Sequence, residues 1–259
     1  MQKFFNNRKV LITGAASGIG RELALLLHGY GARLALWDIQ ADKLDVVADA
    51  HTAVVDVCDA AQVSQAMNEA VAALGGLDVV VHCAGIGRSG LFADKPIEEH
   101  QKVMQVNFGG TLNVAHAAIE PLKQSQGSLV LMGSVSAFYG PPEYNTYAAT
   151  KAAVLNLAQA LRIELAPHKI HVCVVSPHTV KTPMFDEAFA KTSVIRNPNF
   201  FIEVNTVDRI VNAIARGIYR KRFIVYCSFR SWLIYFFSRY VDFLAGRLMA
   251  FTWRRASSS

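Results

Sequence analysis

Cysteine is scarce in this sequence, and none of it forms a metal-binding or redox motif. Four cysteines occur in 259 residues, at positions 58, 83, 173 and 227, without a Cys-x-x-Cys pair. Wide spacing within apolar segments is typical of packed, reduced thiols, and it argues against a disulfide-rich secreted domain or a cysteine-based zinc site. We therefore expect no metal site and a reducing compartment, the cytoplasm.

Long apolar segments are also missing, although 52% of the residues are hydrophobic. No apolar stretch of signal-peptide length precedes the first predicted strand. Near the C-terminus the longest uncharged run, 231–238, is far shorter than the ~20 residues that span a bilayer. The length and composition instead predict one large α/β domain with a full core.

Acidic residues are lacking in one region of the chain. Residues 220–259 contain eight Lys and Arg but only one acidic residue, whereas the other 219 residues contain 18 cations and 19 anions. The nearly neutral body gives no electrostatic support for nucleic-acid binding. We predict a catalytic domain over residues 1–228 and a basic, amphipathic tail over residues 229–259.

A glycine-rich turn follows the first predicted strand, 9–12, and precedes a helical pattern of leucines. This order of strand, turn and helix is the context that a dinucleotide site requires. Gly14 suits the tight turn, Gly18 lets the backbone approach a pyrophosphate, and Gly20 allows close packing of helix on strand. The predicted cofactor-binding residues of this turn are Gly14, Ser17, Gly18, Ile19 and Gly20.

Two acidic residues end the next two strands. Asp38 follows the strand 33–37, where a carboxylate accepts hydrogen bonds from an adenosine ribose and repels a 2′-phosphate, so it favours NAD over NADP. The alternative is that Asp38 caps a helix beginning near Ala41. Asp56, with Val57, follows the strand 53–55 and would meet the adenine, with a capping role in the loop as the alternative.

Further strands are predicted at 77–81, 129–133, 171–175 and 223–226, with helical patterns between them. This alternation predicts a single-domain, Rossmann-like, doubly wound parallel sheet with flanking helices. Ligands of such sheets bind at the carboxyl ends of the strands. Ala84, Gly85, Ser134 and Pro177 all follow strands and are expected at that edge.

Tyr147 and Lys151 lie at positions i and i+4 of a predicted helix, 146–162, and therefore share one face. A neighbouring ammonium group favours the phenolate and would lower the pKa of the tyrosine toward the working range of a base. Such pairs are common on helices, so the pair alone is weak evidence for catalysis.

Taken in order, the residues resemble the classical short-chain dehydrogenases/reductases over residues 8–226. The matching elements are the Thr13–Gly20 pattern, Asp56, Ala84, Gly85, Asn107, Ser134, Tyr147, Lys151, Pro177 and Thr182. The resemblance implies hydride transfer between a nicotinamide and a substrate carbon.

The resemblance also implies a catalytic tetrad. Tyr147 would exchange a proton with the substrate oxygen, and Ser134 would stabilise the charge developing on that oxygen. Lys151 would lower the pKa of the tyrosine and bind the nicotinamide ribose, and Asn107 would hold a water that links Lys151 to solvent. Pro177 to Thr182 would close over the carboxamide end of the cofactor.

Two histidines depart from the family pattern. His82 and Cys83 stand where the family usually has two asparagines, and we expect His82 to support the sheet rather than to catalyse. His178 replaces the glycine that usually follows Pro177, where it could narrow the site or contact substrate.

The substrate is expected to be an apolar small molecule. Aromatic residues near the tetrad and in 183–205 either line an apolar pocket or belong to the core. The tail, residues 229–259, would lie on an anionic membrane surface at the inner face or pack on a sister subunit of a homo-oligomer.

The sequence thus predicts an NAD(H)-dependent oxidoreductase for a lipophilic secondary alcohol or ketone. One alternative is an NADPH-dependent 3-oxoacyl or 3-ketosphinganine-type reductase. A non-catalytic, NAD-binding interaction protein is an alternative of another class.

Overall fold

A seven-stranded parallel sheet forms the centre of the protein, as the sequence predicts. The structure is a computed structural model that describes residues 1–188, 192 and 203–240. The strand order is β3-β2-β1-β4-β5-β6-β9. The strands are β1 (Lys9–Thr13), β2 (Arg33–Asp38), β3 (His51–Val54), β4 (Val79–His82), β5 (Ser128–Met132), β6 (His171–Ser176) and β9 (Ile224–Tyr226).

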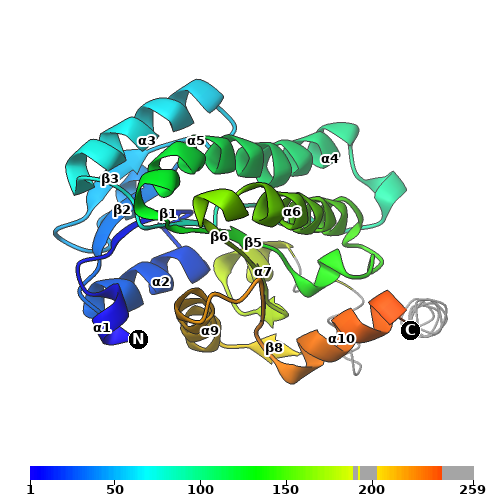
Figure 1. The fold of residues 1–259 in the computed structure, drawn as a ribbon. Helices are drawn as coiled ribbons and strands as arrows, with labels where there is room; N and C mark the ends of the chain where they lie inside the picture. The colour runs from blue at the N-terminus through cyan, green and yellow to red at the C-terminus, as the bar shows by residue number, and fades with distance from the viewer. Residues whose placement is uncertain (189–191, 193–202, 241–259) are drawn as a thin grey trace.

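Helices cover both faces of this sheet (Figure 1). On one face lie α1 (Gln2–Phe5), α2 (Gly18–Gly29) and α9 (Val207–Tyr219). On the other face lie α3 (Ala60–Leu74), α5 (Gly110–Ser125) and α6 (Asn145–Glu164). Neighbouring side chains of a strand point to opposite faces, so Ile12 packs with the first group of helices and Leu11 with the second. Burial of the strands on both faces explains their almost continuous apolar sequences.

The connection after β2 differs from the prediction. The helix expected to begin near Ala41 is only a 3-10 turn, Ala41–Lys43, and the next strand begins at His51 instead of residue 53. The Oδ1 atom of Asp38 accepts the N–H of Gln40 at 3.0 Å and turns the chain immediately after the strand. This local side-chain bond competes with helix formation.

A small second sheet and two further helices complete the region after β6. Strand β7 (Thr179–Val180) pairs in parallel with β8 (Val204–Asn205), and α7 (Pro183–Ala188) follows β7. The last described helix, α10 (Phe229–Tyr240), follows β9 and lies at the edge of the molecule (Figure 1). Within the described ranges, no helix combines the length and apolar character needed to cross a bilayer.

Candidate active site

A cleft of about 280 Å³ opens at the carboxyl ends of β1, β2 and β4. It brings together eleven of the predicted cofactor-binding residues: Gly14, Ser17, Gly18, Ile19, Gly20, Asp38, Asp56, Val57, Ala84, Gly85 and Thr182. These residues come from several loops that are far apart in sequence. They meet because the strands are parallel and end at the same edge.

The glycine turn is shaped so that side chains would not fit. Gly14 has a φ of +68°, and a Cβ there would lie 2.7 Å from the nitrogen of Ala84. A Cβ at Gly20 would lie 2.1 Å from the carbonyl oxygen of Gly14. Gly18 begins α2 and lines the cleft, so the N-terminus of this helix faces the cleft, which is the arrangement that binds phosphate.

Asp38 holds this turn as well as lining the cleft. Its Oδ2 atom accepts the N–H of Ala16 at 3.0 Å, while Oδ1 accepts the N–H of Gln40. Asp56 also lines the cleft, and its Oδ1 accepts the N–H of Cys58 at 2.9 Å. Both carboxylates thus order their own loops, and both remain able to accept further hydrogen bonds.

The predicted catalytic residues meet beside the cleft. The Tyr147 hydroxyl is hydrogen-bonded to Ser134, which caps the turn after β5 and accepts the Ser136 hydroxyl at 2.9 Å. The Nζ atom of Lys151 lies 5.6 Å from the centre of the Tyr147 ring and donates to the carbonyl oxygen of Met132 at 2.9 Å. Helix α6 thus presents both residues to the end of β5.

Burial moves the pKa values of this pair in opposite directions. It raises the pKa of Tyr147 to about 12, and the hydrogen bond with Ser134 offsets part of that increase. It lowers the pKa of Lys151 to about 8. The direction for Tyr147 is opposite to the expected lowering of its pKa, because desolvation by burial is the largest influence on it.

Asn107 lies in a π-helical turn, Gln105–Gly109, between α4 (Ile97–Met104) and α5. Its side chain accepts the N–H of Ile86 at 2.8 Å and donates to the carbonyl oxygen of Ile86 at 3.0 Å. It also donates to the Thr150 hydroxyl on α6 at 3.3 Å. Asn107 therefore fixes the backbone after β4 against the helix that carries the tyrosine and lysine.

Gly85 connects the cleft to the catalytic residues. A Cβ at Gly85 would lie 3.1 Å from Oδ1 of Asn107 and 3.8 Å from Nζ of Lys151. The backbone of Gly85 also lines the cleft. The backbone of Gly85 thus lies between the cleft and the side chains of Asn107 and Lys151.

The family model for short chain dehydrogenases matches residues 8–193. The chain belongs to the short-chain dehydrogenase family. Members of this family are oxidoreductases that use a nicotinamide cofactor, so the resemblance seen in the sequence and the oxidoreductase class are both confirmed.

Curated and solved relatives cover most of the chain. A 3-oxoacyl-[acyl-carrier-protein] reductase of Thermotoga maritima is 36% identical over 200 residues, which are 73% of this chain and 81% of the relative. An 11-beta-hydroxysteroid dehydrogenase-like protein of Arabidopsis thaliana is 34% identical over 235 residues, 86% of this chain and 74% of the relative. The structure of a short chain dehydrogenase from Mycobacterium paratuberculosis bound to NAD superimposes with a TM-score of 0.75 at 27% identity, covering 83% of this chain and 91% of that chain.

The residues present fit the family's cofactor. The left-handed φ of Gly14 and the close packing of Gly20 on Gly14 form the tight turn before α2, and the N-terminus of α2 lines the cleft, where a pyrophosphate would bind. The carboxylate of Asp38 stands at the end of β2, where a ribose is recognised in such sheets.

The first departure from the short-chain dehydrogenase pattern, His82, is part of the sheet. His82 is buried, and its Nδ1 atom lies 2.8 Å from the hydroxyl of Thr13, which in turn accepts the N–H of Ala84 at 3.2 Å. Burial lowers the pKa of His82 to about 3, so the imidazole is neutral. It bridges the ends of β4 and β1, as expected for a structural role.

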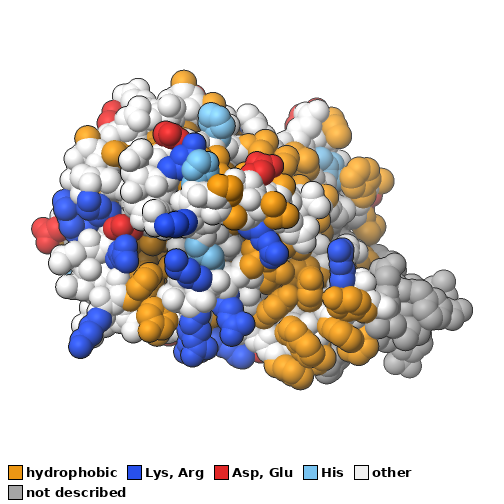
Figure 2. All heavy atoms as spheres, viewed as in Figure 1, with side chains coloured by type: hydrophobic (Ala, Val, Ile, Leu, Met, Phe, Trp, Pro, Cys, Tyr) orange, Lys and Arg blue, Asp and Glu red, His pale blue; other side chains and the backbone are white. Residues whose placement is uncertain are grey.

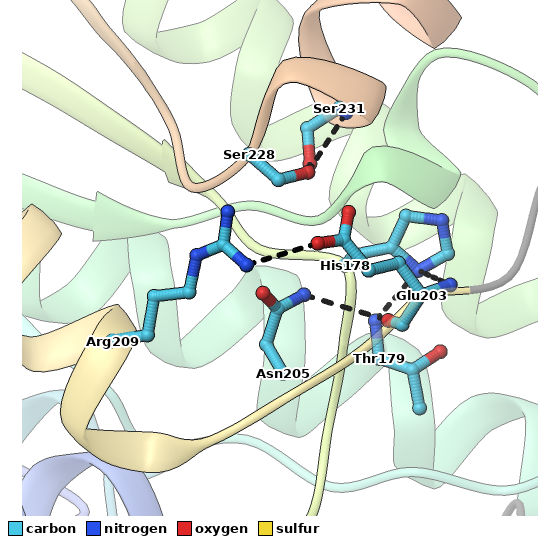
Figure 3. A network of polar contacts seen from close by, with 7 residues as sticks. All are labelled: His178, Thr179, Glu203, Asn205, Arg209, Ser228 and Ser231. Carbon is cyan, nitrogen blue, oxygen red and sulfur yellow. Dashed lines mark hydrogen bonds and ion pairs between the residues drawn. The ribbon is translucent and has the colours of Figure 1, made fainter.

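The second departure, His178, connects two segments after β6 (Figure 3). Its Nδ1 atom accepts the N–H of Thr179 at 2.8 Å and the N–H of Glu203 at 3.3 Å. The Glu203 carboxylate pairs with Arg209 at 3.0 Å. His178 thus holds the start of β7 to the residue before β8.

Some predicted residues lie outside the cleft, and some of its residues were not predicted. Within the described ranges Tyr147, Lys151 and Pro177 are not among the cleft-lining residues, although the carbonyl oxygen of Pro177 accepts the N–H of Val135 beside Ser134. Lys102 and Val106 line the cleft without having been predicted. Their i, i+4 spacing on the helix that leads to Asn107 is the signal that could have identified them.

The expected apolar pocket is only partly visible. Phe138 packs its ring on Tyr226 and Tyr235, at 6.3 and 5.0 Å, which favours the interpretation as core. Met184 lines the cleft. Residues 189, 200 and 201, three further predicted aromatic positions, lie outside the described residues.

Proposed function

We propose that the protein transfers a hydride between NAD(H) and a lipophilic secondary alcohol or ketone, with Tyr147 as the acid/base. The observation that carries this proposal is the hydrogen bond of Tyr147 with Ser134 beside the buried Lys151. When bound, the nicotinamide would supply the hydride acceptor or donor. The side chains of the protein would supply the proton and the stabilisation of charge.

In the direction of reduction, the Tyr147 hydroxyl gives its proton to the carbonyl oxygen as the carbon receives the hydride. A neutral phenol suits this step, and the raised pKa of Tyr147 keeps it protonated. The Ser134 hydroxyl donates a hydrogen bond to the same oxygen and stabilises the negative charge that develops there. Asn107 keeps Ile86 and α6 in register, so that the phenol and the cleft stay aligned.

Lys151 would act on the cofactor and on the tyrosine together. Its ammonium group lies close to Gly85, at the end of the cleft, where it can donate to a ribose hydroxyl. In the direction of oxidation its positive charge would favour the Tyr147 phenolate that accepts the alcohol proton.

The proposed preference for NAD over NADP is based on the residues at the end of β2. Asp38 is followed by Ile39 and Gln40, all of which line the cleft, and none of them can pair with a 2′-phosphate as an arginine would. The alternative is an NADPH-dependent 3-oxoacyl or 3-ketosphinganine-type reductase. The Thermotoga maritima relative, a 3-oxoacyl-[acyl-carrier-protein] reductase, supports the ketone-reducing part of that alternative.

Two observations support a lipophilic substrate: the description of one relative and one apolar side chain that lines the cleft. The Arabidopsis relative is described as 11-beta-hydroxysteroid dehydrogenase-like, and its match covers more of this chain than that of the reductase. Met184 adds an apolar side chain to the cleft. We therefore propose apolar alcohols and ketones as the first compounds to test, in a cytoplasmic enzyme.

The test compares the turnover of such compounds by the wild type and by Tyr147→Phe, and turnover is monitored by the absorbance of NADH. Loss of the hydroxyl should lower kcat by about 100-fold or more, the usual size of a general acid/base contribution, without weakening NADH binding. Tyr219→Phe, on α9, is the matched control and should keep full activity. Unchanged turnover in Tyr147→Phe would instead favour the non-catalytic interaction protein.

A further inference from the structure

Helix α10 turns its most aromatic face away from the protein. Phe229, Trp232, Phe236 and Tyr240 are spaced by three, four and four residues and so lie along one side of the helix. Their exposed fractions are 69%, 41%, 41% and 68%. Their rings stack in series, with centroids 5.0 to 5.8 Å apart. Figure 2 shows a broad group of hydrophobic side chains over this helix.

The opposite side of α10 attaches it to the body. Ser231 and Ile234 are buried, and the Ser228 hydroxyl caps the start of the helix by accepting the N–H of Ser231 at 3.1 Å. The Tyr235 ring packs on Phe138, in the loop that follows Ser134. The helix therefore packs on the body through Ile234 and Tyr235 while its aromatic stripe faces outward, so it carries apolar side chains on two sides.

Arginines border the aromatic stripe on both sides. At about 100° per residue, Arg239 lies to one side of the stripe and Arg230 to the other, and both are exposed. An apolar stripe bordered by cations is the pattern of a helix that lies in a membrane interface, because long cationic side chains reach up to the headgroups.

We propose that the outer face of α10 binds the surface of an anionic lipid bilayer. The sequence from residue 220 to residue 240 contains no acidic residue. A second copy meeting this face about a two-fold axis would bring arginines against arginines without a carboxylate on the helix to pair with them. Anionic lipid headgroups would complement the positive charge of this segment, and the acyl chains would take up the aromatic rings.

Binding in this way would place the bilayer beside the site. Helix α10 lies against the turn Val135–Ala137 that begins at Ser134, and Tyr235 contacts Phe138 there. Membrane binding itself does not depend on the proposed reaction, so it is measured without substrate or cofactor.

The test is flotation of the full-length protein with vesicles of phosphatidylcholine alone or with phosphatidylglycerol added. We expect binding only to the anionic vesicles, decreasing as salt is raised. Replacing Trp232 and Phe236 by serine should reduce partitioning by at least about tenfold, because two aromatic side chains would no longer enter the bilayer. Arg239→Glu should reduce it as well.

Two matched control variants distinguish an effect of the outer face of α10 from the effect of losing any exposed aromatic ring or any surface charge. Phe92→Ser removes an aromatic ring that is 64% exposed on another part of the protein, and Lys3→Glu reverses a charge on α1. Both should partition like the wild type. Circular dichroism and NADH binding check that each variant is folded.

Three results would overturn the proposal. They are no binding of the wild type to anionic vesicles, equal binding of the Trp232/Phe236 double variant, and equal loss in the two controls. Light scattering adds a fourth: a double variant that changes only the molecular mass would assign the face to a second copy.

Discussion

The cationic side chain of Lys151 is buried by the protein itself. Its side chain keeps one hydrogen bond, to the carbonyl oxygen of Met132, and its pKa is lowered from 10.5 to about 8 because the charged form loses hydration. Burial of such a residue lowers the stability of the fold, and its lowered pKa lets it release and bind a proton near neutral pH. The cost has a definite dependence on pH.

We expect Lys151→Met to be more stable than the wild type at pH 7, by about 2–3 kcal/mol. Below the folded pKa both states of the wild type carry the proton, so the full penalty applies. Between about pH 8 and pH 10 the unfolded chain still binds the proton while the folded protein releases it, so wild-type stability rises and the difference shrinks.

Urea unfolding of the two proteins at several pH values measures this difference. Lys3→Met, at an exposed position, serves as the control and should show no such trend. If the difference in unfolding free energy between wild type and Lys151→Met stays constant from pH 7 to pH 10, the lowered pKa of Lys151 is contradicted.

At the scale of elements, the short strands β7 and β8 position one wall of the cleft. They contain two residues each and cannot be stable by themselves. His178 accepts two hydrogen bonds, one from the adjacent Thr179 and one from Glu203 that joins the two segments, and Thr182, just after β7, contacts the cleft opposite Gly18. A histidine in place of the family's usual glycine thus strengthens this connection.

We expect His178→Gly to lower the free energy of unfolding by about 1–3 kcal/mol, the contribution of two hydrogen bonds. It should also weaken NADH binding, because Thr182 loses its support. His178→Asn keeps an acceptor oxygen and should recover part of both effects. Chemical unfolding and cofactor titration measure them, and wild-type values for the glycine variant would show that the two bonds contribute nothing.

At the scale of the whole molecule, one sheet edge collects every part of the site. The cofactor cleft, Ser134 and Pro177 all stand at the carboxyl ends of strands, with helices covering both faces of the sheet (Figure 1). Because the cleft is built from loops after β1, β2, β3 and β4, binding there requires the folded sheet. Ligand binding should therefore stabilise the protein as a unit.

We expect NADH at 100 times its dissociation constant to stabilise the protein by about 2.7 kcal/mol and to raise Tm by roughly 5–10 °C. NADPH at the same concentration should give a smaller shift, since Asp38 opposes a 2′-phosphate. Thermal melts followed by fluorescence compare the two. A larger shift with NADPH would favour the alternative reductase.

Much of the fold and of the site could be read from local sequence. The strand and helix patterns predict the parallel sheet, the glycine turn and Asp38 identify the cleft, and the Tyr147–Lys151 spacing identifies the pair proposed for catalysis. These features depend on backbone periodicity and on residues close together in the chain. The same locality explains the errors, such as the helix expected after Asp38.

The sequence by itself therefore determined the sheet, the family and the residues at the strand ends, because each follows from short-range patterns. Only the tertiary structure decided the environment of those residues. The pKa of Tyr147 rises because distant segments bury it, His178 finds Glu203 25 residues away, and α10 shows which of its two apolar sides faces out. Burial and long-range contacts depend on packing between elements, which no local pattern encodes.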